Sequence, residues 1–266
     1  MTGTKKYILL DTDFCIKSVK IKNGATRLID LIMNFSECDF FCHQKTLEEL
    51  SNHDDEAKTW LLSQISSKKI HLFTDKQILD ELGQVYGILK YTAYCSFLEN
   101  ACNAYDAQYY KNHFGTLLAC GKDLDDTRFL TELATCETAI GQSKSLGEKK
   151  SAVLLQLLQF LYPGQVYVFC SDDSGARKGF TNFGDVKCLS VISAFAVLKD
   201  LGYSKNDLEQ YFVSYENLCN ITNQVSFKVW KSTSPERISV PRRQVFNEIF
   251  SDNFEVLQMG DLKYKR

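Results

Sequence analysis

The sequence predicts an α/β fold, built on a doubly wound and mostly parallel β-sheet, from two apolar runs and from the order of the elements between them. Residues 7–10 and 166–170 are unbroken apolar runs, and carboxylates follow each run within two residues. An unbroken apolar run is typical of a strand that is buried on both faces of a parallel sheet. Strand-like runs alternate with helical patterns along the chain, as a parallel sheet with helical crossovers requires.

The expected elements follow one another as a series of strands and helices. Strands are expected at residues 6–11, 39–42, 70–73, 166–170 and 186–189, and helices at 25–35, from 45, at 57–65, at 147–162 and at 193–201. A long helical stretch fills residues 76–140. Pro163 and Gly164 end the apolar helix before them, as is usual after a helix C-terminus.

We divide the chain into a domain at residues 1–203, with the helical stretch 76–140 as an insertion, and a C-terminal α+β extension at 204–266. The extension is expected to hold a helix at 204–217, a strand at 225–230, and a helix that has Pro241 in its first turn and continues to Phe250.

The composition is that of a globular protein without an unusual charge. The 266 residues are 44% apolar and 24% charged, and the formal net charge is −2. This balance excludes a global basic field for a nucleic-acid partner and leaves room for a local basic patch. No apolar stretch reaches the roughly 18–20 residues of a membrane span. The ten cysteines form no C-x-x-C pair and no secretory leader precedes them, so we expect reduced thiols in a cytoplasmic protein.

Cys38, Cys42 and His43 are close enough in the sequence to suggest a zinc site. A structural zinc ion takes four ligands, and the remaining ones are not visible in the sequence. A core strand that contains these residues, with free thiols acting as small hydrophobes, explains them better.

Acidic residues stand at four positions that a parallel sheet would bring to one edge. Asp11 follows the first strand, and Asp172 and Asp173 follow the fourth. Glu148 lies in the first turn of a helix, where the macrodipole favours a carboxylate, and Glu49 lies on the first helix after the second strand. In open α/β sheets, ligands bind outside the carboxyl ends of the strands.

Several carboxylates at one edge repel one another unless a cation joins them. Oxygen ligands without histidine or cysteine favour hard ions, so we expect Mg²⁺ or Mn²⁺. Such an ion lowers the pKa of a bound water and neutralises charge on a phosphate, which is the chemistry of metal-assisted phosphodiester hydrolysis.

Four short motifs, in this order, resemble those of the PIN-domain ribonucleases. They are Leu-Asp-Thr-Asp at residues 10–13, Thr-Leu-Glu-Glu-Leu at 46–50, Gly-Glu at 147–148 and Ser-Asp-Asp-Ser-Gly-Ala-Arg at 171–177. The resemblance covers about residues 1–75 and 145–203, so the helical stretch between them is an insertion. Asp13 stands where the family often has Asn, and Glu48 is an alternative to Glu49 as the second acid.

The resemblance implies a PIN-like, divalent-metal-dependent endoribonuclease. It implies catalytic roles for Asp11, Glu49, Glu148 and Asp173 (with Asp172 as the alternative), metal binding by Asp11, Glu148 and Asp173, and Ser171 as a hydroxyl that orients the site. Single-stranded or looped RNA is the favoured substrate, DNA is the alternative, and no membrane is involved. The implied role is a toxin, with an antitoxin or another regulatory protein partner, or a phage-defence effector. The additional segments argue against a minimal toxin.

Other interpretations also fit the sequence. Asp11 alone is explained as the cap of a helix that starts at Thr12, and Glu49 and Glu148 alone as ordinary helix residues. The chain is also explained as a catalytically inactive PIN-like module that binds nucleic acid or protein. A haloacid-type phosphatase is a further alternative, because it needs the Asp-x-Asp pattern that Asp11 and Asp13 supply.

Basic residues surround Trp230 in the C-terminal extension. Lys228, Lys231, Arg242 and Arg243 are candidates for phosphate contacts, with Trp230 as a ring on which a base stacks. A solvated basic face is the alternative.

Aromatic residues of the helical stretch follow helical spacing. The series is Tyr91, Tyr94, Leu98, Ala101 and Tyr105. This spacing predicts one packed face, and the stacking of nucleic-acid bases on the rings is the alternative.

Overall fold

The computed structural model describes residues 5–35, 37–121, 123–141, 146–219, 224–231 and 234–251, with the backbone alone at 226–231 and 234–238. The contacts divide the chain into two compact units. Unit 1 comprises Met1–Cys15 and Ser36–Cys188, and unit 2 comprises Ile16–Phe35 and Leu189–Arg266. The predicted boundary between residues 203 and 204 stays a prediction, and the contacts group residues 189–203 with the C-terminal part.

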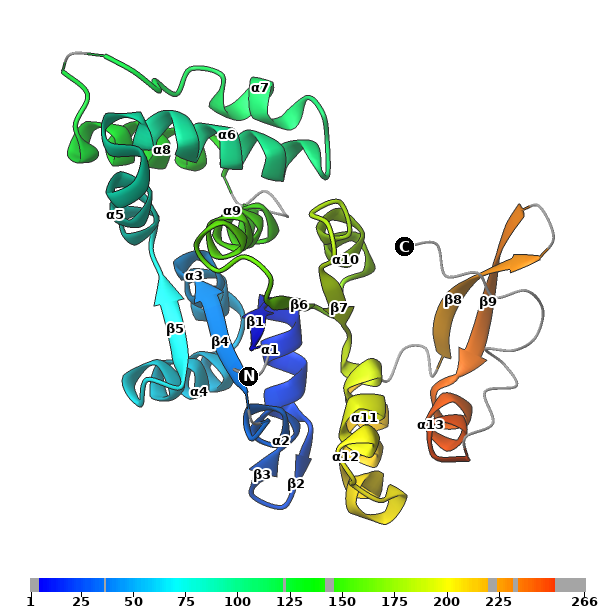
Figure 1. Cartoon of the computed structure of the whole chain (residues 1–266). Helices are drawn as coiled ribbons and strands as arrows, with labels where there is room; N and C mark the ends of the chain where they lie inside the picture. Colours follow the sequence, from blue (N-terminus) through cyan, green and yellow to red (C-terminus); the bar gives the residue numbers. More distant parts are fainter. Residues whose placement is uncertain are drawn as a thin grey trace. The chain divides into compact units, whose positions relative to one another are not determined.

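A five-stranded, all-parallel sheet has the strand order β5-β4-β1-β6-β7 (Figure 1). The strands are β1 (Lys6–Leu10), β4 (Cys38–His43), β5 (Ile70–Phe73), β6 (Val166–Cys170) and β7 (Lys187–Leu189). The predicted α/β fold with a parallel sheet is confirmed. The register pairs Leu9 of β1 with Phe41 of β4 and with Phe169 of β6. All three side chains are buried, which explains the unbroken apolar runs.

Helices connect the strands of unit 1 largely as the sequence predicts. They are α3 (Gln44–His53) and α4 (Asp55–Ser66) before β5, and α9 (Leu146–Leu161) before β6. A short helix, α10 (Ser174–Phe180), follows β6. Helix α1 (Thr12–Lys20) starts in unit 1 and continues into unit 2.

The helical stretch after β5 consists of separate helices, and we call residues 75–140 the helical segment (Figure 1). Its elements are α5 (Asp75–Tyr86), the 3₁₀ turn η1 (Gly87–Leu89), α6 (Lys90–Asn103), α7 (Tyr109–Phe114) and α8 (Asp126–Ile140). Helix α6 packs on α5 and α9. Tyr91, Tyr94, Leu98 and Ala101 are buried in the core of unit 1. These four residues confirm the predicted packed face, while Tyr105 lies beyond the end of α6.

Unit 2 holds helices and two antiparallel hairpins. Its elements are β2 (Lys22–Asn23), β3 (Thr26–Arg27), α2 (Leu28–Met33), α11 (Val191–Asp200), α12 (Lys205–Leu218), β8 (Gln224–Lys231), β9 (Ser234–Pro241) and α13 (Arg242–Ser251). The rings of Phe212 and Phe246 stack with centroids 4.1 Å apart, and Phe195 meets both rings edge-on. In the described parts of both units, no helix has the length and apolar character that a bilayer crossing needs.

The structure adds α1, α10 and β9 to the expected series and corrects it at residues 25–27 and at Pro241. Helices α1 and α10 are short, and each begins one residue after an Asp, at Thr12 and Ser174. Residues 25–27 belong to the β2-β3 turn and hairpin rather than to a helix, because Gly24 has the positive φ of 59° that a tight turn favours. Strand β9 was not predicted, and Pro241 is its last residue rather than a helix residue. A strand end tolerates proline where no ladder hydrogen bond is needed from its nitrogen.

Candidate functional site

Asp11 and Ser171 lie side by side where β1 and β6 end. The register pairs Leu10 with Cys170, and the backbone N–H of Asp11 donates to the carbonyl oxygen of Cys170 (3.0 Å). The hydroxyl of Ser171 donates to Asp11 Oδ2 (2.7 Å). Asp11 is 5% exposed and Ser171 is fully buried. The parallel register therefore fixes both residues at the carboxyl edge, as the sequence predicts.

Glu49 is held against the start of α9. The hydroxyl of Thr12 donates to Glu49 Oε2 (2.6 Å). A Cβ atom at Gly147 would lie 2.5 Å from Glu49 Oε1, so the carboxylate occupies the space that a side chain would need. Glu48, the alternative second acid, is exposed and pairs with Lys45 (3.1 Å). The structure thus brings Glu49, rather than Glu48, toward the Gly-Glu motif.

Glu148 and Asp173 reach the same edge from two helices. Glu148 lies half-buried in the first turn of α9. Asp173 is exposed and caps α10, because its Oδ1 accepts from the N–H groups of Gly175 and Ala176. The N–H of Asp173 also donates to the Ser171 hydroxyl (3.2 Å), while Asp172 lies half-buried beside it. We call Asp11, Glu49, Glu148 and Asp173 the acidic cluster.

The four carboxylates of the acidic cluster act on one another. Burial raises the pKa of Asp11 to about 7; Glu148 and Glu49 add to the shift, and the hydrogen bond from Ser171 opposes it. Burial also raises the pKa of Glu148, with Glu49 and Asp173 adding to the rise and Lys149 opposing it. The acidic cluster is therefore a place where negative charge is concentrated and incompletely solvated.

Tyr105 of the helical segment lies beside the acidic cluster, which the sequence did not predict. Burial raises the pKa of Tyr105, and the carboxylates of Glu148, Asp11 and Asp173 add to the rise. Its position two residues beyond the end of α6 carries no sequence signal for this place.

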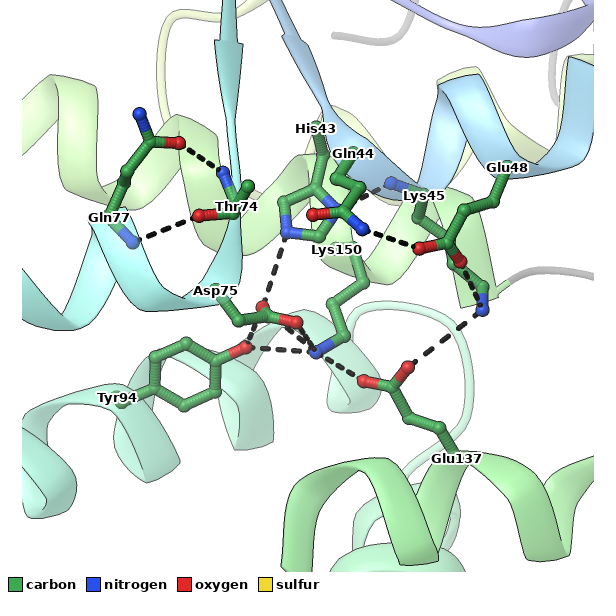
Figure 2. Close-up of polar contacts among 10 residues, drawn as sticks. All are labelled: His43, Gln44, Lys45, Glu48, Thr74, Asp75, Gln77, Tyr94, Glu137 and Lys150. Atoms are coloured by element: carbon green, nitrogen blue, oxygen red, sulfur yellow. Dashed lines mark hydrogen bonds and ion pairs between the residues drawn. The ribbon is translucent and has the colours of Figure 1, made fainter. Parts of the chain in front are cut away.

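A second group of charged residues lies at the carboxyl ends of β4 and β5 (Figure 2). Lys150 is fully buried, and its Nζ lies 3.0 Å from both carboxylate oxygens of Asp75, 2.9 Å from Tyr94 Oη and 2.5 Å from Glu137 Oε1. Tyr94 also donates to Asp75, and His43 Nε2 lies 3.2 Å from Asp75 Oδ1. We call these five residues the lysine cluster. They come from β4, α5, α6, α8 and α9, so no motif in the sequence announces them.

Lys150 is the shared cation of the lysine cluster, and Lys45 lies 3.8 Å from the other oxygen of Glu137. Burial acts to raise the pKa of Asp75, but the Lys150 ammonium and His43 outweigh it and lower that pKa. Burial likewise acts to lower the pKa of Lys150, but Asp75, Tyr94 and Glu137 outweigh it and raise that pKa well above its usual value. Both groups are therefore held in their charged forms.

The suggested zinc ligands Cys38, Cys42 and His43 all lie on β4, as the core-strand interpretation predicts. His43 Nδ1 accepts from the N–H of Lys45 (3.0 Å), and its Nε2 faces Asp75. Across the residues that the structure describes, no three His, Cys, Asp or Glu side chains stand as a ready-made metal-binding group. The acids of the acidic cluster lie near one another, but their side chains are not arranged as a complete set of metal ligands.

The predicted nucleic-acid-binding residues are only partly described. The side chains of Lys228, Trp230 and Lys231 lie outside the described residues. Arg243 forms ion pairs with Glu209 and Glu216 of α12, and its guanidinium carbon lies 4.7 Å from the centroid of the Phe212 ring. Arg242 lies over the ring of Tyr215, with its guanidinium carbon 5.4 Å from the centroid. Arg243 therefore contributes to the packing of unit 2.

Fold and site together define an α/β protein with a parallel sheet and a carboxylate cluster at its carboxyl edge. No protein-family model matches this chain, and no curated protein matches it.

Proposed function

We propose that the chain is a divalent-metal-dependent nuclease with a doubly wound, PIN-like sheet into which the helical segment is inserted. One observation carries the proposal: Asp11 is buried at the sheet edge among further acids. Burial raises its pKa to about 7, and the neighbouring carboxylates of Glu148 and Glu49 add to this rise. A hard divalent cation is the partner that relieves such a group.

The donor chemistry fits Mg²⁺ or Mn²⁺. Asp11, Glu148 and Asp173 would hold the ion, and Glu49 would complete the site directly or through a water. Glu148 is half-buried and Asp173 exposed, so both side chains have room to turn toward a shared ion. A bound ion supplies an activated water and neutralises charge on the phosphate.

The protein's own residues hold the ligands in place. Ser171 donates to Asp11 and accepts from the N–H of Asp173, so a single hydroxyl connects two of the acids. Thr12 donates to Glu49, and Gly147 leaves the space that the Glu49 carboxylate fills. These contacts keep like charges together before an ion binds.

Single-stranded or looped RNA is the proposed substrate, because the PIN-domain ribonucleases that the motifs resemble cut such RNA. A role as a toxin under the control of a protein partner, or as a phage-defence effector, follows from the same resemblance. A nucleic-acid partner needs lysine or arginine side chains that neutralise its phosphates. Lys228, Trp230, Lys231 and Arg242 are the proposed contacts, while Arg243 would have to leave two carboxylates to take part.

A cleavage assay tests the proposal. The purified chain is incubated with Mn²⁺ or Mg²⁺ and with single-stranded RNA, single-stranded DNA, duplex DNA or a small phosphomonoester. We expect metal-dependent cleavage of RNA that Asp11→Asn abolishes. Asp39→Asn is the matched control, because Asp39 lies near the start of β4 at the opposite edge, where it pairs with Lys5 (2.9 Å).

Hydrolysis of the phosphomonoester alone would favour the haloacid-type phosphatase with Asp11 and Asp13. RNA binding without cleavage at any metal concentration would favour the inactive module. Equal cleavage by wild type and Asp11→Asn would overturn the proposed site.

A further inference from the structure

Tyr105 connects the helical segment to the two helices that carry Asp173 and Glu148. Its hydroxyl donates to the carbonyl oxygen of Ala176 in α10 (3.2 Å). Its ring packs so closely on α10 that a Cβ at Gly179 would overlap Cε1 of the ring. On α9, the ammonium of Lys149 lies 5.1 Å from the centroid of the same ring. One side chain thus contacts both α10, which Asp173 caps, and the residue that follows Glu148.

Lys149 makes this contact an electrostatic one. It is 1% exposed, and its ammonium lies 3.8 Å from the centroid of the Tyr109 ring as well as over Tyr105. Burial lowers the pKa of Lys149, and the dipole of α9 also disfavours a cation in the first turn. Two aromatic faces stabilise the cation where water cannot. The helical segment therefore holds the positive charge next to Glu148.

The position of Asp173 depends strongly on what supports α10. This helix has only seven residues, and Asp173 itself is exposed. Glu148 belongs to the sixteen-residue helix α9, which is buried along most of its length. Tyr105 is a contact that joins the short helix to the long one.

We infer that Tyr105 is a positioning residue of the proposed metal site, which sets the place of Asp173 relative to Glu148. The inference rests on the proposed nuclease function and assigns the helical segment a part in it. The helical segment then supports the proposed site through Tyr105, which contacts Ala176 of α10 and Lys149 of α9.

Tyr105→Phe tests the inference, because it keeps the ring against Gly179 and removes the hydrogen bond to Ala176. Tyr91→Phe is the matched control: Tyr91 is buried in the same segment and donates to Asp126 (2.8 Å), away from α10. The first readout is amide hydrogen exchange at Gly175 and Ala176, whose N–H groups donate to Asp173, without metal. The second is the affinity for Mn²⁺ in a calorimetric titration.

In Tyr105→Phe we expect exchange at these two amides to be about fivefold faster and Mn²⁺ affinity to be about fivefold weaker, the size of one lost hydrogen bond. Tyr91→Phe should change neither. Gly179→Ala approaches the same contact from α10, since its methyl group displaces the ring, and it should give the pattern of Tyr105→Phe.

Wild-type exchange rates in both Tyr105→Phe and Gly179→Ala would overturn the positioning role. Faster exchange with unchanged Mn²⁺ affinity would separate Asp173 from the metal site and would overturn it as well. A wild-type protein that neither binds Mn²⁺ nor cleaves nucleic acid would instead refute the nuclease proposal, and with it the metal-site role of Tyr105, while the exchange rates still report whether Tyr105 holds α10.

Discussion

At the carboxyl ends of β4 and β5, Lys150 lies between Asp75 and Glu137, whereas at the ends of β1 and β6 Asp11 lies near Glu49 and Glu148. Lys150 and Asp11 are both buried, in the same unit and at the same edge of one sheet. The pKa of Asp75 is lowered because Lys150 and His43 outweigh the effect of burial, whereas the pKa of Asp11 is raised by burial, to which the neighbouring acids Glu148 and Glu49 add. The chain therefore places a cation among one set of carboxylates and gathers the other set around a buried acid.

The difference supports a structural role for the lysine cluster and the proposed metal-site role for the acidic cluster. A buried ammonium that has carboxylate and hydroxyl partners on several sides holds helices together. Carboxylates that raise one another's pKa cost stability in the absence of a ligand and bind a cation when one is present. The following experiments break or sharpen this comparison.

The largest effect on stability is expected from Lys150→Met. The substitution leaves Asp75 and Glu137 without their cation, so the free energy of unfolding should fall by about 3–5 kcal/mol. Urea denaturation measures it. Lys76→Met is the control, because its pair with Asp80 (2.8 Å) is exposed and screened by solvent, so the free energy of unfolding should fall much less. Equal losses in the two variants would mean that the lysine cluster is not a structural centre.

Asp11→Asn should have the opposite sign. At pH 8 and without metal, removing one carboxylate from the acidic cluster should leave the free energy of unfolding unchanged or raise it by about 1 kcal/mol. The same denaturation series measures it, and the stabilisation of wild type by added Mn²⁺ should be absent in the variant. A loss of more than about 2 kcal/mol would show that Asp11 is a structural residue like Asp75.

The pH dependence of the lysine cluster follows from its two shifted groups. The pKa of Asp75 is lowered in the folded state, so its contribution is present above the unfolded value of about 3.9 and is lost as the pH falls below it. The pKa of Lys150 is raised, so its contribution is complete below the unfolded value of about 10.4 and is lost as the pH rises above it. The stability difference between wild type and Lys150→Met should shrink below about pH 4 and above about pH 10. A difference that is as large at about pH 3 as at about pH 8 would contradict this assignment.

A small loss of stability is expected from Gly147→Ala. The new methyl group would meet the Glu49 carboxylate at 2.5 Å, and this flexible, half-buried side chain can move away at a cost of about 1 kcal/mol. Mn²⁺ affinity and cleavage should fall although the fold persists. Gly121→Ala serves as the control, because its methyl group would meet Leu124 Cβ at an ordinary 3.9 Å. Unchanged metal affinity in Gly147→Ala would remove Glu49 from the site.

The sequence predicted the parts of the molecule that depend on local order. Apolar runs predicted the strands, and the residues directly after them predicted which acids reach the sheet edge, because parallel strands end together. Gly147 is a further example. The sequence predicted a site role for its neighbour Glu148, and the structure adds that the Glu49 carboxylate occupies the space where a side chain at position 147 would lie.

The parts that could not be predicted depend on distant segments. His43, Asp75, Tyr94, Glu137 and Lys150 belong to five elements, and their meeting follows from tertiary packing rather than from spacing. Tyr105 continues the helical spacing of aromatic and apolar residues in the sequence, although helix α6 ends at Asn103. Helix α10 is too short to show a period, so the sequence carries no separate signal for the cap at Asp173.

The first turn of α9 has a consequence for how this helix is set in the protein. Nearly every residue from Leu146 to Leu158 is buried, so an apolar stripe does not define one rotation about the helix axis. Glu148, Lys149 and Lys150 point about 100° apart, and each meets different partners: the acids, the two tyrosine rings, and the Asp75–Glu137 pair. Three neighbouring charged residues therefore fix the rotation of α9 about its axis, which its buried apolar residues alone would leave undefined.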